Sequence, residues 1–318
     1  MLVFFLVISS LCNAGKSHGG VIKTVIILYM FSTVLAAVIA VFASMAFPVK
    51  MTLANAATDT SAPQGIVEVL NNLLLNVVAN PVSSLVNANY VGILMWAVLL
   101  GLAFRAADKM TKKVLADVAD GISMVVTWII NLAPFGIFGL VFNTVSTNGL
   151  DIFTTYGKLL LLLVGCMLFI YFVTNPLLVY WCIRQNPYPL IFQCLKRSAL
   201  TAFFTRSSAA NIPVNMKVCE EMGLDRDTYS VTIPLGATIN MDGAAITITV
   251  MTMATAFTLG IHVDIPTAII LSLLAALSAC GASGVAGGSL LLIPMACSLF
   301  GISDDISMQV VAVGFIIG

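Results

Sequence analysis

Charged residues are what this sequence has least of, because only 9% of its 318 residues are Asp, Glu, Lys or Arg. Soluble proteins contain about 25%, and 60% of this chain is hydrophobic, so a water-soluble fold is excluded first. Disordered chains are polar and rich in charge, which excludes disorder as well. The 14 basic and 14 acidic residues cancel, so there is no basic face for phosphates and we expect no nucleic-acid partner.

Residues that bind metals or form disulfides are few or unsuitably spaced. The seven cysteines form no Cys-x-x-Cys pair and mostly lie in apolar runs, where we expect them to be reduced and to pack as small hydrophobic groups. His18 and His262 are the two histidines of the chain. The sequence also lacks a His-Glu-x-x-His motif, a phosphate-binding loop and a dinucleotide motif, which disfavours ATP-driven pumping and redox chemistry and predicts no organic cofactor.

Long apolar runs are abundant instead. They cover residues 24–47, 66–104 with an interruption at Asn80–Pro81, 117–145 and 154–182. Each run supplies the roughly 20 residues that a transmembrane helix needs. We therefore predict an all-α polytopic membrane protein.

Both ends of the sequence lie inside apolar runs, so we expect a piece of a larger transporter. A cleaved signal peptide over residues 1–14 is the alternative. It is disfavoured because Lys16 follows the apolar stretch, whereas signal peptides carry their basic residues before it.

Two later stretches have arms that are too short to span a membrane. Residues 188–216 and 266–299 each divide into two apolar arms around a small polar tip. An arm of about a dozen residues cannot cross about 30 Å of hydrocarbon at 1.5 Å per residue. Each stretch is therefore predicted to form a re-entrant helical hairpin.

Basic residues predict that the two hairpins enter from opposite sides. Lys and Arg gather in alternate connections, and connections such as 146–153 contain none, which by the positive-inside rule separates cytoplasmic from external connections. Each hairpin is followed by a further apolar segment, 229–257 and 306–318. The unit of a hairpin followed by a helix therefore occurs twice, in opposite orientations. This arrangement predicts an inverted repeat with a substrate site near the middle of the membrane.

The stretch Pro234–Gly243 predicts a cation site. Pro234 removes a helical hydrogen bond and the glycines tolerate non-helical angles, so backbone carbonyls can be freed. Asp242 is the one acid well inside an apolar span, where an uncompensated carboxylate costs at least about 2.5 kcal/mol. Oxygen atoms from Asp242, Asn240 and the main chain suit a small hard cation such as Na⁺. The alternative is an interhelical hydrogen bond or a carboxylic acid kept neutral by desolvation.

The tips of the two hairpins are candidates for an anionic ligand. Ser207, Ser208 and Asn211 in the first tip, with glycine-flanked amides over 281–288 in the second, would suit a carboxylate. Small residues also permit close helix packing, which explains the glycines equally well. Arg206 is another charge that is costly in an apolar span, so it either snorkels to the interface or pairs with a residue outside this sequence.

Four segments carry a resemblance to a known family: Thr205-Arg206-Ser207-Ser208, Asn240-Met241-Asp242-Gly243, the glycine-rich second hairpin and Asn131–Phe138. The chain resembles the dicarboxylate/amino acid:cation symporter family, which has the glutamate-transporter fold. Within it, the chain is most similar to bacterial sodium-coupled serine/threonine transporters. The resemblance implies a homotrimer in the lipid bilayer of the bacterial inner membrane, and Na⁺ as the coupling ion.

The resemblance also implies a division of the chain. Residues 1–182 would be mostly scaffold helices, together with the sodium-site helix 24–47 and helix 154–182. Residues 188–318 would be a transport core that slides through the scaffold, with the second hairpin as the outer gate. In this core the resemblance implies a broken helix over 229–257 and a truncated last helix over 306–318.

Site residues follow from the same resemblance. Na⁺ would bind Asn240 and Asp242, with help from the main chain of Gly236. A second sodium site would use Thr238 and the carbonyls of Ala279, Cys280 and Ala282, and a third position would use Tyr29, Ser32 and Thr33. The substrate carboxylate would be held by Ser207, Ser208 and the amides near Val285 and Gly287.

Two departures from the family pattern bear on the substrate. Ala244 stands where members that carry acidic substrates usually have threonine, and Ala209 stands where a third serine is common. We therefore expect import of a small neutral amino acid, serine or threonine. A sodium- or proton-coupled dicarboxylate or glutamate symporter is the alternative within the family.

The sequence also has features of two other classes of membrane protein, an intramembrane protease and an ion channel. Gly281-Ala282-Ser283-Gly284 matches the Gly-x-Ser-Gly of intramembrane serine proteases, but neither His18 nor His262 is expected at the depth of that serine. We therefore expect no enzymatic activity. Freed carbonyls and an acid also line ion channels, which conduct without substrate, whereas a symporter couples the two.

Overall fold

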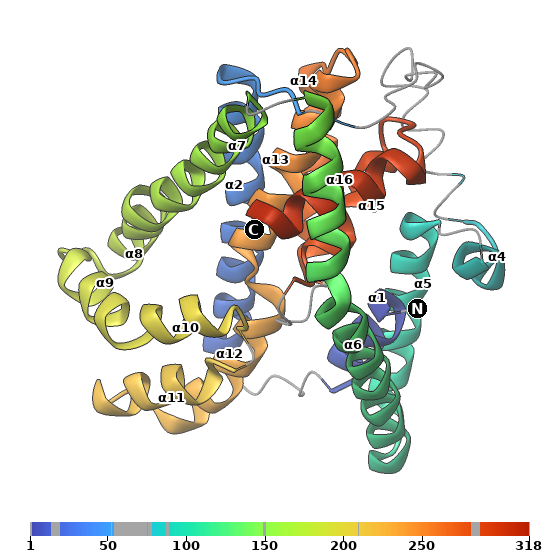
Figure 1. The fold of residues 1–318 in the computed structure, drawn as a ribbon. Helices are drawn as coiled ribbons and strands as arrows, with labels where there is room; N and C mark the ends of the chain where they lie inside the picture. Colours follow the sequence, from blue (N-terminus) through green and yellow to red (C-terminus); the bar gives the residue numbers. More distant parts are fainter. Residues whose placement is uncertain are drawn as a thin grey trace.

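The structure is a computed structural model, and it is all-helical in the part of the chain that it describes (Figure 1). It describes residues 2–13, 20–51, 53, 75, 78–86, 89–148, 151–208, 210–280 and 287–317. Three described helical stretches are long and apolar enough to cross a membrane, namely Lys23–Ala46, Tyr156–Ile183 and Thr228–Thr258. The predicted all-α class is confirmed, and the apolar helices fit a membrane protein.

The described part before residue 149 contains the α-helices α1 (Leu2–Asn13), α2 (Gly20–Ala46), α4 (Pro81–Val86), α5 (Tyr90–Ala103) and α6 (Lys109–Asn148). The interruption that the sequence predicts at Asn80–Pro81 is a helix start. The Asn80 side chain accepts hydrogen bonds from the amides of Val82 and Ser83, at 2.9 and 3.2 Å. Pro81 occupies the first helical position, where its missing N–H costs nothing. Most of the predicted span before Asn80 lies outside the described residues.

The predicted span 154–182 is one long helical stretch with a widened turn. α7 (Asp151–Phe169) passes through a π-helical turn, Ile170–Thr174, into α8 (Asn175–Ile183). Pro176 has no N–H to donate to the carbonyl of Phe172, four residues earlier. That carbonyl instead accepts a hydrogen bond from the Tyr188 hydroxyl at 3.3 Å. This bond ties Tyr188, at the start of the following segment, to the π turn.

The first predicted hairpin consists of two helical arms. Its descending arm is α9 (Tyr188–Cys194), a π turn and α10 (Leu200–Thr205), and its returning arm is α11 (Ile212–Glu221). An ion pair between Arg197 and Glu221 links the arms away from the tip. In Figure 1 both arms lie beside the lower end of α12.

The remaining helices are α12 (Arg226–Ile239), α13 (Asp242–Thr258), α14 (Ile265–Ala279), α15 (Ile293–Ser298) and α16 (Asp304–Ile317). α12 is capped by the Asp225 carboxylate, which accepts from the amide of Thr228 at 2.9 Å. α12 and α13 together fill the predicted broken segment 229–257. α14 and α15 fill much of the second predicted hairpin, and residues 281–286 of its predicted tip lie outside the described residues.

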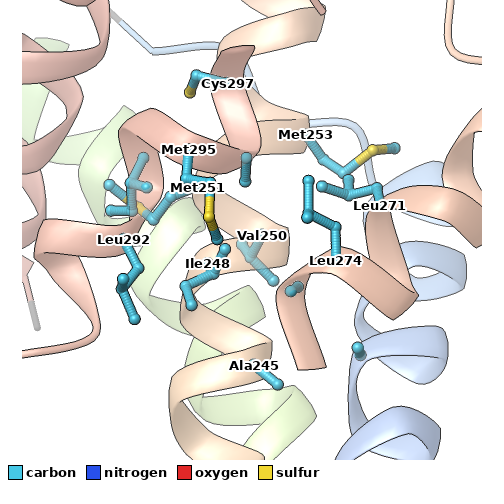
Figure 2. Packing of buried hydrophobic residues seen from close by; sticks show 14 of the residues in the cluster. Ala245, Ile248, Val250, Met251, Met253, Leu271, Leu274, Leu292, Met295 and Cys297 are labelled. Atoms are coloured by element: carbon cyan, nitrogen blue, oxygen red, sulfur yellow. The ribbon is translucent and has the colours of Figure 1, made fainter. Parts of the chain in front are cut away.

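α13 forms the centre of the core. Every residue from Ala245 to Ala256 is buried, because α2, α7, α14 and α15 all pack against this helix. Figure 2 shows Ile248 and Met251 of α13 directed toward Leu292 and Met295, and Met253 close to Leu271 of α14. A helix that is apolar on all sides is stable only when it is surrounded. α2, α7, α14 and α15 are therefore arranged around α13.

Shortening a buried side chain of α13 is expected to destabilise the protein. Met251 is fully buried, and Met251→Ala should lower the free energy of unfolding by about 2–5 kcal/mol through lost contacts and a cavity. Met308→Ala on α16 is the matched control, because Met308 is 54% exposed. Midpoints of thermal unfolding in detergent measure both variants. Equal midpoints for the two would contradict the central place of α13.

Candidate functional site

The two halves of the broken helix are separated by Asn240 and Met241. These residues have φ/ψ of −99/77° and −113/53°, which are not helical. The Asn240 amide still donates to the carbonyl of Gly236 at 2.9 Å, and this bond closes α12. The break falls six residues after Pro234, because a proline removes only one hydrogen bond and α12 continues to Ile239. Asp242 opens α13, so its carboxylate lies at the positive end of that helix.

Two hydroxyl groups of α2 lie within hydrogen-bonding distance of the Asp242 carboxylate. Ser32 Oγ donates to Oδ2 at 2.7 Å, and Thr33 Oγ1 lies 3.2 Å from Oδ1. Both side chains are buried, with 8% and 0% exposure. The Met241 amide, freed by the break, donates to Thr33 Oγ1 at 3.2 Å. The structure therefore joins the predicted third sodium position on α2 to the predicted cation residue Asp242.

Oxygen atoms outnumber protons around Thr33. Its Oγ1 lies 3.0 Å from the carbonyl oxygen of Tyr29, 3.2 Å from Asp242 Oδ1, and 3.5 Å from both Asn240 Oδ1 and the carbonyl oxygen of Ile239. A hydroxyl has one proton, so it satisfies one of these four acceptors at a time. A cluster that has more acceptor oxygens than donors is an environment that a hard cation stabilises. We call Ser32, Thr33, Asn240, Asp242 and the Ile239 carbonyl the oxygen cluster.

The composition of the oxygen cluster favours a monovalent cation. Asp242 is its one carboxylate, and the other members are hydroxyl, amide and backbone oxygens. In the part of the chain that the structure describes, no three His, Cys, Asp or Glu side chains come together to hold a metal ion. Thiolate and imidazole are the ligands that zinc and copper prefer, so an oxygen set with one negative charge suits Na⁺ better.

A cavity of about 360 Å³ lies beside the oxygen cluster. Its walls come from α2, the tip of the first hairpin and α12. It brings predicted substrate residues and predicted cation residues into one space: Tyr29, Ala202, Arg206, Ser207, Ser208, Asn211, Asn215, Ile233, Gly236, Ala237 and Asn240. A volume of this size falls within the range of small-molecule sites. The Asn240 side chain belongs both to the cavity wall and to the oxygen cluster, so it connects them.

The tip of the first hairpin is held by its own polar residues. Arg206 ends α10 in the left-handed conformation, with φ of 51°. Ser207 Oγ accepts from the amide of Ala210 at 3.2 Å. Asn211 donates from Nδ2 to Ser198 Oγ, and Ser198 donates to Asn215 Oδ1, both at 2.6 Å. These bonds tie α11 to the π turn of the descending arm and so fix the tip that faces the cavity.

Sequence reasoning missed Ser198 and Asn215 at this tip. A signal for them was present, because Asn211 and Asn215 are four residues apart and therefore share one face of a helix. Buried amides require hydrogen-bond partners, and Ser198 supplies one from the facing arm. The cavity residues Ala202, Ile233 and Ala237 carry no such signal, because their side chains are apolar like most of the chain.

Close packing between α2 and α12 requires glycine at position 236. A Cβ atom there would lie 2.9 Å from the ring of Tyr29. The Tyr29 hydroxyl in turn donates to the carbonyl of Thr232 at 3.3 Å. Gly236 therefore lets the Tyr29 ring lie against α12, where it forms part of the cavity wall.

The predicted second sodium position is brought together only in part. Cys280 Sγ lies 3.5 Å from the carbonyl of Ile239, so the end of α14 reaches the break. The hydroxyl of Thr238 donates within its own helix, to the carbonyl of Leu235 at 2.8 Å. Ala279 is buried at the end of α14. Ala282 lies outside the described residues.

The predicted contribution of the second tip to substrate binding is only partly described. Val285 and Ser283 lie outside the described residues. Gly287 has φ of 74°, and a Cβ atom there would lie 3.0 Å from the Phe315 ring of α16. The structure therefore places Gly287 against α16, and it is not among the residues described as lining the cavity.

Comparison with known proteins gives two similarities over the whole chain. The sequence pattern of the Sodium:dicarboxylate symporter family matches residues 1–318. The serine/threonine transporter SstT of Bifidobacterium adolescentis is 60% identical over 319 residues, which cover 100% of this chain and 74% of that protein. Both similarities therefore include the break at Asn240–Met241 and the residues around the cavity.

A methyl group at position 236 is expected to displace Tyr29. Gly236→Ala should lower the free energy of unfolding by about 1–3 kcal/mol, because the ring must move out of its packed position. Gly243→Ala is the control, since nothing lies within 4 Å of a Cβ atom there, and it should be neutral or slightly stabilising. Midpoints of thermal unfolding measure both effects.

A double-mutant cycle tests the cause of that loss. In a Tyr29→Ala background the ring is absent, so Gly236→Ala should cost less than it does in the wild type. An undiminished cost would show that the Tyr29 ring is not the group that excludes a side chain at position 236.

Proposed function

Because this chain belongs to the sodium:dicarboxylate symporter family, we propose that it is a sodium-coupled symporter that imports serine and threonine. Members of this family are transporters, so the protein is not an enzyme and the intramembrane protease alternative is excluded. The serine and threonine substrates agree with the name of the relative that is 60% identical. They also agree with Ala244, which lacks the hydroxyl usual in carriers of acidic substrates.

The observation that carries the proposal is the shortage of protons in the oxygen cluster. A single Thr33 hydroxyl faces three acceptor oxygens of this cluster, from Ile239, Asn240 and Asp242. A bound Na⁺ would satisfy these oxygens together, whereas the hydroxyl satisfies one. Sodium binding at Ser32, Thr33, Asn240 and Asp242 would also compensate the carboxylate, which is costly within a membrane.

Coupling would follow from the residue shared by the two sites. Asn240 contributes to the oxygen cluster and to the wall of the cavity. A cation that fixes the Asn240 amide would thereby preorganise the cavity, and substrate in the cavity would in turn hold Asn240 for the cation. Such linkage is reciprocal, so each ligand raises the affinity for the other by the same factor. A channel has no such requirement, and this distinguishes the two functions.

Substrate would occupy the cavity of about 360 Å³ between α2, the first tip and α12. Ser207 and Ser208 would hold its carboxylate through hydroxyl and amide groups, together with amides of the second tip near Val285 and Gly287. Asn211 offers an additional acceptor, because its Oδ1 atom is buried without a hydrogen-bond partner. Closure of the second tip would follow when sodium and substrate are both bound.

The larger architecture is also part of the proposal. Residues 188–216 and 266–299 would be re-entrant hairpins that enter from opposite sides, and the chain would contain an inverted repeat in the inner membrane. The returning arms α11, of ten residues, and α15, of six, support this because neither could span a bilayer. Residues 188–318 would form the mobile transport core of a homotrimer, whereas residues 1–182 would be mostly scaffold, apart from 24–47 and 154–182.

A dicarboxylate is the second candidate substrate, and Arg206 is the observation that favours it. Its side chain is exposed and lines the cavity, where a guanidinium could bind a second carboxylate. Competition against labelled serine separates the candidates. Serine and threonine should compete fully, and aspartate should not.

Removing the charge of Asp242 is expected to abolish sodium-driven uptake. Asp242→Asn keeps the shape of the side chain but leaves the oxygen cluster without its negative charge, so sodium-dependent serine uptake into vesicles should fall by at least about tenfold. Thr33→Val should raise the sodium concentration for half-maximal uptake, because it removes the central oxygen. Thr249→Val is the control, since that buried hydroxyl of α13 has no partner and lies outside the oxygen cluster. An unchanged sodium response in Asp242→Asn would contradict the proposed mechanism.

A further inference from the structure

A second cavity, with a volume of about 790 Å³, lies between α2 and α7. We call it the α2–α7 groove. Its walls are almost entirely apolar, and Phe42, Phe47 and Leu161 in them are 55%, 68% and 73% exposed. Lys158 is the one charged residue among those described as lining it. The sodium and substrate residues discussed above do not line this groove, so the proposed transport mechanism leaves it unexplained.

The length of the groove matches one leaflet of a bilayer. Along α7 its lining runs from Lys158 to Phe169, which are eleven positions apart and therefore separated by about 16 Å at 1.5 Å per residue. Half of a hydrocarbon core of about 30 Å is about 15 Å. Along α2 the lining runs from Ile39 to the residues just after the helix end, including Val49. In Figure 1, α2 ends and α7 begins at the same end of the molecule.

The single charge lies at the end of the groove where a lipid headgroup would be. Lys158 is two residues inside the apolar stretch that starts at Tyr156, so its ammonium group can reach the interface while its stem remains in the groove. It is exposed and has no ion-pair partner among the described residues, whose salt bridge joins Arg197 to Glu221. Lys50 follows Val49 directly and is also exposed. A positive charge above an apolar slot complements an anionic phosphate above an acyl chain.

We infer that the α2–α7 groove binds one anionic phospholipid, with an acyl chain between the helices and the headgroup phosphate at Lys158. The inference rests on α2 and α7 spanning the membrane, as in the proposed function, but it assigns a ligand that the transport cycle does not require. Apolar side chains this exposed need an apolar neighbour. A lipid supplies that neighbour together with the negative charge that Lys158 needs.

Native mass spectrometry of the full-length protein tests the inference directly. The purified protein is titrated with phosphatidylglycerol and phosphatidylcholine that carry identical acyl chains, and bound lipids are counted. The wild type should retain one phosphatidylglycerol per protomer more strongly than phosphatidylcholine. If it retains neither lipid, a further helix or a neighbouring subunit fills the groove and the inference is wrong.

Two substitutions test the contact with the acyl chain and the contact with the lipid headgroup separately. Gly165 lines the groove and nothing lies within 4 Å of a Cβ atom there, so Gly165→Leu should fill the slot and weaken the binding of both lipids. Gly157→Leu is the matched control on the same helix, because its Cβ position is equally open but Gly157 does not line the groove. Lys158→Gln should keep the acyl chain but reduce the preference for phosphatidylglycerol about fivefold, the usual effect of one basic residue on anionic lipid.

Three results would overturn the inference: Gly165→Leu binds lipid as the wild type does, Gly157→Leu loses lipid equally, or Lys158→Gln keeps the full headgroup preference. Sodium-driven serine uptake is measured on the same preparations. If the wild type retains phosphatidylglycerol but takes up no serine, the lipid-binding inference is supported and the proposed transport function is contradicted. If the wild type takes up serine but retains no lipid, the proposed transport function is supported and the lipid-binding inference is contradicted.

Discussion

A carboxylate held deep in an apolar bundle is the constraint on which the rest of the structure depends. Asp242 would be costly there without compensation, and two hydroxyls of α2 and the end of a broken helix are placed around it. The break itself supplies what an unbroken helix cannot, namely the Ile239 carbonyl and the Met241 amide directed at the same point. An excess of acceptor oxygens at this point is what the proposed sodium ion would compensate.

The packing of the helices holds the surroundings of Asp242 in place. α13 is surrounded on all sides, so Asp242 at its first residue is fixed relative to α2, α14 and α15. α12 is less buried than α13, and its close approach to α2 depends on Gly236 and the Tyr29 ring. The buried half therefore carries the charge, and the other half carries the cavity wall with Asn240 at the junction. This division is suited to a site in which cation and substrate must influence each other.

Local chemistry in the sequence predicts part of this site. Proline, two glycines, an amide and an acid within Pro234–Gly243 indicate loosened backbone near a charge, and the structure has its break in that stretch. Ser32 and Thr33 could not be found in this way, because two hydroxyls in an apolar helix are equally typical of packing. Their contact with Asp242 joins residues about 210 positions apart, and only the family resemblance brought them forward. Cys280 was expected to be apolar filler, yet its thiol lies against the Ile239 carbonyl.

The fold, like the site, is predicted only in part by the sequence. Composition alone predicts helices and a membrane, and Asn80–Pro81 predicts where one helix begins. The π turn before Pro176 and the Ser198–Asn215 bond depend on which segments meet, and sequence spacing does not give this. The most direct test of the central claim is an experimental structure determined in sodium and again in choline. The account predicts an ion between Thr33, Asn240 and Asp242 in sodium only. Ser32 and Thr33 still bonded directly to Asp242 in sodium, with no ion between them, would contradict it.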